Sequence, residues 1–179
     1  MNKPDKFKVF GNKVLVKADM EADEAENGII IPESCLIHDW NAAVIQVGNQ
    51  CSLVGVGDNV LYSKEYAMMP FSDQLEYRIV GESNLIASID DGLILPLNGF
   101  VLCKPEDDVR IKKGIHIPDK KKQIVYKATV MRASVDASAE YHAGDYVYFN
   151  TNLAIQCEEN GNPLVLVPMD NIELKQSRG

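Results

Sequence analysis

Residues that could do metal chemistry are few and far apart in this sequence. Cys35 and His38 lie three positions apart and could supply two ligands to zinc, but a structural zinc site needs four. The four cysteines, at positions 35, 51, 103 and 157, form no Cys-x-x-Cys pair. We therefore expect no bound metal, and reduced thiols of the kind found in cytoplasmic proteins.

Nucleotide-binding and hydrolytic chemistry find little support either. Gly55-Val56-Gly57 begins like a dinucleotide-binding loop, but Val60 stands where the third glycine belongs, and no alternation of strand and helix follows. We find no plausible Ser/His/Asp set and no pair of catalytic carboxylates; Asp58 and Asp145 are better interpreted as turn residues. The sequence therefore predicts no catalytic residues, no cofactor and no enzyme activity.

Two apolar motifs point to binding instead. They are Gly28-Ile29-Ile30-Ile31-Pro32 and Gly114-Ile115-His116-Ile117-Pro118, each between charged tracts. Charged flanks keep a segment in water, and isoleucines exposed there would seek an apolar partner. A short apolar run between Gly and Pro is also typical of a buried strand, but the charged flanks and the repetition favour an exposed loop.

Alternation along an extended segment separates the side chains of these motifs. Ile29 and Ile31 face one side and Ile30 the other, and the second motif keeps the outer pair, Ile115 and Ile117, around His116. We take the outer pair as the docking face and His116 as a half-exposed bystander. The candidate binding residues are Gly28, Ile29, Ile30, Ile31, Gly114, Ile115, His116 and Ile117.

The elements that carry these motifs occur twice. Val14-Leu15-Val16-Lys17 returns as Val101-Leu102-Cys103-Lys104, and further blocks recur in the same order at offsets of 86 or 87 residues. These blocks include Ala42 to Ile45 with Ala128 to Met131, Gly57 to Tyr62 with Gly144 to Phe149, and Asn84 to Ile86 with Asn171 to Glu173. A repeat of this kind predicts two homologous domains, at residues 1–90 and 93–179.

Each repeat is expected to be all-β. Short Val/Ile/Tyr-rich runs broken by Gly, Asn, Asp and Pro predict strands, beginning with Lys13 to Lys17 in the first repeat. Asn160-Gly161 between two apolar runs predicts a hairpin turn. The two motifs then lie in long loops after the first strand of each repeat.

Composition and charge limit the classes of molecule that this protein could bind. The net charge is −8, with −7 in residues 1–90, and binding to nucleic acid requires a basic face instead. Apolar stretches all fall short of the ~20 residues that a membrane helix needs, and Met1 to Phe10 does not resemble a secretory signal. We expect a cytoplasmic protein that binds neither nucleic acid nor membrane.

Each repeat resembles the GroES or 10-kDa co-chaperonin family along nearly its whole length. The resemblance is carried by Val-Leu-x-Lys, the long loop with Gly-Ile-x-Ile-Pro, Ala-x-Val, Gly-Asp-x-Val-x-Tyr/Phe and the terminal Asn-x-Ile-type strand. It implies two tandem GroES-like β-barrels and a ring-shaped homo-oligomer. The loops with Ile29 to Ile31 and with Ile115 and Ile117 would correspond to the family's mobile loop. That loop docks on a GroEL-type 60-kDa chaperonin, which itself binds the ATP, and the cap encloses a client protein for folding.

Two departures from the family pattern affect this interpretation. Bacterial members have a roof hairpin where this sequence has only residues 49–56 and 135–143. The lack of that hairpin resembles phage-encoded co-chaperonins. The tandem form resembles plastid double-domain members, although the N-terminus does not look like a transit peptide, so we expect a bacterial or phage-infected cytoplasm. Whole two-domain chains cannot tile a sevenfold partner in one closed layer, and the sequence leaves the ring size open. A phage structural or decoration β-barrel that binds no chaperonin stays as the alternative.

Overall fold

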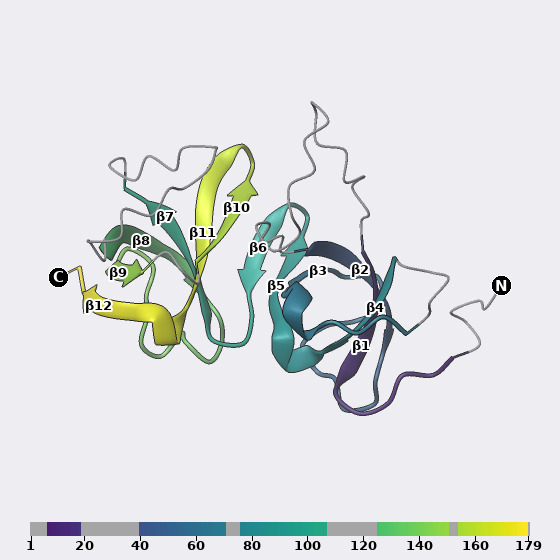
Figure 1. The fold of residues 1–179 in the computed structure, drawn as a ribbon. Coiled ribbons are helices and arrows are strands. Elements are labelled where there is room, and N and C mark those ends of the chain that lie inside the picture. Colours follow the sequence, from purple (N-terminus) through teal and green to yellow (C-terminus); the bar gives the residue numbers. More distant parts are fainter. Residues whose placement is uncertain (1–6, 19–39, 71–75, 107–124, 151–153, 179) are drawn as a thin grey trace. The chain divides into compact units, whose positions relative to one another are not determined.

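The computed structural model describes residues 7–18, 40–70, 76–106, 125–150 and 154–178 (Figure 1). In these ranges the chain forms β-strands and single-turn 3-10 helices. The described residues include no helix of the length and apolarity needed to cross a membrane. The chain divides into two compact units, Met1–Asp90 (unit 1) and Asp91–Gly179 (unit 2).

Unit 1 is built from short strands whose apolar side chains are buried. Val14, Leu15 and Val16 are at most 2% exposed, and their strand pairs with a neighbour on each side. The strands are β1 (Lys13–Ala18), β2 (Trp40–Val47), β3 (Asn59–Tyr62), β4 (Tyr77–Gly81) and β5 (Leu85–Asp90), with 3-10 helices η3 (Lys64–Tyr66) and η4 (Glu82–Asn84).

Unit 2 repeats this plan with two added strands, β6 (Leu93–Pro96) and β10 (Ile155–Glu159). Its core contains Val101, Cys103, Val130, Val147 and Val165, together with further apolar side chains. The strands are β6 (Leu93–Pro96), β7 (Phe100–Pro105), β8 (Val125–Ala133), β9 (Tyr146–Asn150), β10 (Ile155–Glu159), β11 (Asn162–Pro168) and β12 (Ile172–Gln176), with η6 (Met169–Asn171) before β12.

Five strands of each sheet follow the same order. They run β4-β1-β2-β3-β5-β6 and β10-β11-β7-β8-β9-β12; β4-β1-β2-β3-β5 therefore corresponds to β11-β7-β8-β9-β12. All the described pairings are antiparallel. The all-β prediction is confirmed: the chain has two six-stranded antiparallel sheets, consistent with tandem β-barrel domains.

The correspondence extends to irregular features. The pairing of β1 with β2 shifts register between Leu15 and Val16, and that of β7 with β8 shifts between Leu102 and Cys103, the equivalent step. A register shift of this kind is a local bulge that bends the strand. The same bend therefore occurs at the same place in both units.

The Gly-Asp turns also match. The N–H of Gly57 donates to Val44 O at 2.8 Å and that of Gly144 to Val130 O at 2.9 Å, and both glycines have φ of 94°. Glycine adopts this conformation without the steric cost that a Cβ brings. Asp58 and Asp145 accept hydrogen bonds from the N–H groups of Gly55 and His142, at 2.7 and 3.1 Å. Their prediction as turn residues is confirmed.

The segments opposite the loops form no hairpin. Residues 48–58 and 134–145 are all described, and they contain turns and irregular backbone but no strand. The Asn160-Gly161 hairpin does form, between β10 and β11, with positive φ at both turn residues. This is the backbone that a two-residue turn of the primed type requires.

Candidate docking site

The eight candidate binding residues, Gly28 to Ile31 and Gly114 to Ile117, lie outside the described residues. They belong to residues 19–39 (loop 1) and 107–124 (loop 2). Cys35 and His38 fall in the same undescribed part of the chain. The structure therefore informs on these loops through the strands where each one begins and ends.

Loop 1 leaves and re-enters a paired strand end. Ala18, the last residue of β1, lies opposite Ala42 of β2. The N–H of Ala18 also donates to Glu76 O at 2.7 Å, just before β4. The root of loop 1 is thus held between neighbours on both sides, and the residues that flank the loop lie at one end of unit 1.

Loop 2 starts from the equivalent place in unit 2, with more side-chain contacts. Pro105 of β7 lies opposite Ala128 of β8. The N–H of Glu106 donates to Lys127 O at 3.3 Å, and the Lys127 ammonium lies 3.5 Å from the Glu106 carboxylate. The same ammonium sits 3.9 Å from the centre of the Tyr146 ring, close enough for a cation–π contact. The root of loop 2 is therefore tied by side chains as well as by backbone.

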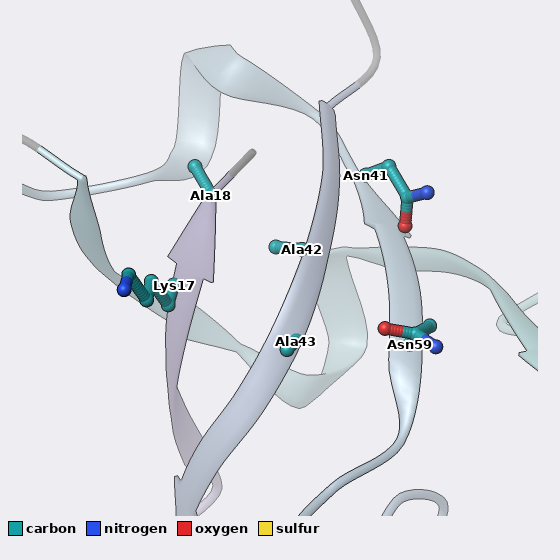
Figure 2. A pocket seen from close by; sticks show the side chains of 6 residues that line it. All are labelled: Lys17, Ala18, Asn41, Ala42, Ala43 and Asn59. Carbon is teal, nitrogen blue, oxygen red and sulfur yellow. The ribbon is translucent and has the colours of Figure 1, made fainter. Parts of the chain in front are cut away.

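The root of loop 1 carries an open hollow instead. Its volume is about 210 Å³, and it is lined by Lys17, Ala18, Asn41, Ala42, Ala43 and Asn59. Figure 2 shows Lys17 on β1, the two alanines of β2 in the middle, and Asn59 on β3 beyond them. Small side chains line its centre and polar ones its sides.

The two loops differ in charge. Residues 19–39 contain seven Asp/Glu and no Lys/Arg, whereas residues 107–124 contain six Lys/Arg and three Asp/Glu. Loop 1 therefore carries −7 and loop 2 carries +3. The excess negative charge of unit 1 lies entirely in its loop.

Burial disfavours the thiolate form at two of the three cysteines that the structure describes. Burial, followed by the nearby Cys157, raises the pKa of Cys103 to about 12, so its thiol stays protonated at neutral pH. Burial also raises the pKa of Cys51. Since the thiolate is the reactive form, both shifts disfavour nucleophilic chemistry at these two residues. The described residues include no group of three His, Cys, Asp or Glu placed to hold a metal ion.

The sequence analysis did not predict one polar cluster in unit 2. The guanidinium of Arg132 donates to both carboxylate oxygens of Glu159, at 2.6 and 2.8 Å, and to Ile94 O at 2.9 Å. The same carboxylate accepts the N–H of Ile94 at 2.8 Å. The hydrogen bond from Arg132 lowers the pKa of Glu159 to about 2, although burial opposes the shift. The pair holds both backbone groups of β6 at Ile94, and nothing in the spacing of these three residues indicated it.

Comparison with known proteins matches unit 1. The family described as chaperonin 10 Kd subunit (Cpn10) matches residues 6–89. Co-chaperonin GroES of Fervidobacterium nodosum is 29% identical over 89 residues, which are 48% of this chain and 99% of that protein. Co-chaperonin GroES of Petrotoga mobilis is 30% identical over 86 residues, 47% of this chain and 97% of that protein. Co-chaperonin GroES of Campylobacter hominis is 32% identical over 60 residues, 33% of this chain and 69% of that protein.

Proposed function

Because this chain belongs to the chaperonin 10 Kd subunit (Cpn10) family, we propose that it caps a GroEL-type 60-kDa ring chaperonin in that partner's ATP-bound state. Loop 1 and loop 2 dock on the ring through their isoleucine tips, and the closed chamber encloses a client protein for folding. The chain assembles with copies of itself into a ring, in a bacterial or phage-infected cytoplasm. ATP is bound by the chaperonin, and this chain has no cofactor of its own.

One observation carries this proposal. The family match runs from residue 6 to residue 89, which spans loop 1 and its Gly-Ile-Ile-Ile-Pro motif. It is therefore a match to the segment that would dock, as well as to the strands that support it. The matched relatives are named co-chaperonins, which supports a binding role for this chain in place of an enzymatic one.

The proposal extends to unit 2 on structural grounds. Unit 2 has the same five-strand order as unit 1, the same bulge and a loop between equivalent strands. Loop 2 carries Ile115 and Ile117 at the positions of Ile29 and Ile31. We therefore assign the same docking role to Gly114, Ile115, His116 and Ile117 as to Gly28, Ile29, Ile30 and Ile31.

Energetics favour collective docking over single-loop docking. Burying one isoleucine yields about 1.5–3 kcal/mol, whereas ordering a flexible segment costs about 1–2 kcal/mol per residue. One loop alone then binds weakly. Several loops on one ring act together, because each docked loop raises the effective concentration of the next. This combination gives tight capping that can be released in each ATP cycle.

The test is ATP-dependent co-migration with a 60-kDa chaperonin. Ile29→Asp together with Ile115→Asp should leave the protein folded and abolish the complex, since a carboxylate cannot enter an apolar groove without a large desolvation cost. Val135→Asp is the matched control, because Val135 is 86% exposed and lies outside both loops. If the double variant still co-migrates with the chaperonin, the isoleucine tips are not the docking residues. A wild-type chain that never co-migrates would instead favour a purely structural role.

A further inference from the structure

The hollow at the root of loop 1 lies over one row of side chains that crosses three strands. Lys17 of β1 lies opposite Ala43 of β2, and Ala43 lies opposite Asn59 of β3. Directly paired residues in an antiparallel sheet point to the same face. Asn41, two residues before Ala43 on β2, shares that face. The row thus has a methyl group at its centre, with polar side chains around it.

Unit 2 has the same row with larger side chains. Lys104 lies opposite Thr129, Thr129 lies opposite Tyr146, and Lys127 takes the place of Asn41. The Tyr146 ring and the Lys127 ammonium, 3.9 Å apart, occupy the space that Asn59 and Asn41 leave open in unit 1. The carboxylate of Glu106 completes this arrangement at 3.5 Å from Lys127. Unit 2 therefore fills the space beside Thr129 from within the chain and places one carboxylate on Lys127, whereas the side chain of Lys104, the counterpart of Lys17, makes no hydrogen bond or ion pair with another described residue.

In unit 1 no described residue partners the donors of this row, and Asp19, the counterpart of Glu106, lies outside the described residues. Lys17, Asn41 and Asn59 are exposed, and none of their side chains makes a hydrogen bond or ion pair with another described residue. In Figure 2 the two asparagines flank one side of β2, and Lys17 extends from the strand on its other side. Its ammonium is a compact charge with three donors on a flexible four-carbon stem. A cation and two carboxamide donors thus border a space that none of the described residues fills.

Charge and size select the ligand for this space. A carboxylate accepts hydrogen bonds only and pairs with one ammonium, as Glu106 does in unit 2. A phosphate dianion matches less well, because one lysine neutralises only half of its charge. A volume of about 210 Å³ is small, so the ligand is a single side chain. The chemistry that fits is that of glutamate or aspartate.

We infer that this hollow is a secondary contact of the cap, which receives an acidic side chain of the ring chaperonin beside the docked loop 1. The inference rests on the proposed function, since the root of loop 1 approaches the chaperonin only if the loop docks there. Unit 2 has no equivalent contact, because Tyr146 and Lys127 already fill the position. Unit 1 is therefore the unit that also recognises an acidic side chain of the chaperonin.

A titration of the free protein tests the hollow without any chaperonin. The probe is the peptide acetyl-Gly-Glu-Gly-amide, with acetyl-Gly-Gln-Gly-amide as its neutral match, read by the side-chain amide NMR signals of Asn41 and Asn59. The glutamate peptide should shift both signals in a saturable way, and the glutamine peptide should not. Lys17→Gln should remove the shift, whereas Lys104→Gln in unit 2 should leave it unchanged.

Chaperonin binding then tests whether the hollow contributes to capping. Lys17→Gln and Asn59→Tyr, which fills the hollow with the residue of unit 2 and keeps the charge, should each weaken chaperonin binding at low salt. A single exposed ion pair predicts a loss of about two- to fivefold per contact. Lys104→Gln should have no effect. If both variants bind like wild type, the secondary contact does not exist, even when wild-type capping confirms the proposed function.

Three results of the titration would overturn the inference. Equal shifts with both peptides would show that the carboxylate is not recognised. Equal shifts with inorganic phosphate would show an unselective anion effect. Absence of any shift would mean that the hollow is closed or already occupied by a carboxylate of this chain. All three can be read even if the protein caps nothing, so failure of this inference is distinguishable from failure of the proposed function.

Discussion

Unit 1 and unit 2 share a strand order and a bulge, but they stabilise equivalent positions with different side chains. In unit 1 the buried carboxylate of Glu82 accepts the N–H groups of Ser52 and Leu53, at 2.7–3.1 Å, and so holds the segment opposite the loop. In unit 2 the corresponding segment is held by the hydroxyl of Ser134, which accepts the N–H of Gly99 at 3.0 Å. Backbone register is common to both units, whereas the side-chain contacts that complete it differ.

The clearest contrast is at the end of the second strand of each unit. The N–H of Gly48 donates to Lys13 O at 2.8 Å and that of Ser134 donates to Phe100 O at 2.9 Å, so the two residues are equivalent. A Cβ on Gly48 would lie 2.2 Å from Gly11 O, whereas Ser134 carries a side chain in the same place. One backbone pattern thus tolerates a side chain in unit 2 and excludes it in unit 1.

The largest expected effect comes from importing that side chain into unit 1. Gly48→Ser should destabilise unit 1 by about 3 kcal/mol, because the backbone must move to admit a Cβ. Fluorescence of Trp40, the single tryptophan of the sequence, follows the unfolding of unit 1 in denaturant. The reverse change, Ser134→Gly, should leave that signal unchanged. If the denaturation midpoint of Gly48→Ser is unaltered, the backbone at Gly11 can move away from the added Cβ without a loss of stability.

A smaller effect is expected from the ion pair of unit 2. Arg132→Leu leaves the Glu159 carboxylate, whose side chain is 11% exposed, without its charged partner. Loss of one partner of a partly buried pair should cost unit 2 about 2 kcal/mol. Hydrogen exchange of the β11 amides reports on unit 2, and Trp40 fluorescence should not change. Equal loss in both units would contradict this assignment of Arg132 to unit 2.

The same pair predicts an acid response of unit 2. The pKa of Glu159 is lowered to about 2 from an ordinary value of 4.5, so its contribution is complete above about pH 4.5. That contribution is lost as the pH falls toward 2, because the unfolded state then binds the proton more readily. Chemical unfolding of unit 2 at a series of pH values should show this loss. Glu159→Gln should reduce the slope, and an unchanged slope would assign the acid response to other groups.

The smallest effect concerns the opposite charges of the loops. Ile115→Asp leaves loop 1, with its net charge of −7, to dock, and Ile29→Asp leaves loop 2, with +3. Whatever the sign of the partner's surface, salt screens attraction for one loop and repulsion for the other. Raising the salt concentration should therefore change the chaperonin affinities of the two variants in opposite directions, by a few-fold. A parallel change in both variants would contradict separate electrostatic contributions.

Local patterns were enough to predict most strands, because each depends on neighbouring residues. Val14 to Val16 and Val60 to Tyr62 are buried as their apolar character indicated, and Asn160-Gly161 forms its turn. The matched residues Asn84 and Asn171 end η4 and η6, directly before the last strand of each shared set, although the sequence did not predict these helices. Burial and turn chemistry at this range are encoded within a few positions.

Contacts between distant residues were beyond sequence reasoning. Arg132 and Glu159 are 27 residues apart, and each also binds Ile94. The contact of Lys127 with Tyr146 depends on the register of β8 and β9, which charge and composition do not specify. The hollow beside Lys17 results from the pairing of alanines on β1 and β2 with Asn59 on β3. Such features are visible only when the strands are paired.

The most direct test of the account is limited proteolysis of both loops under three conditions. We predict cleavage near Glu26 and near Lys113 in the free protein, and protection of those sites only when a 60-kDa chaperonin and ATP are both present. Protection that appears in both loops together would show that both units dock. Resistance of the two sites in the free protein, or cleavage that continues unchanged with chaperonin and ATP, would contradict docking through the isoleucine tips.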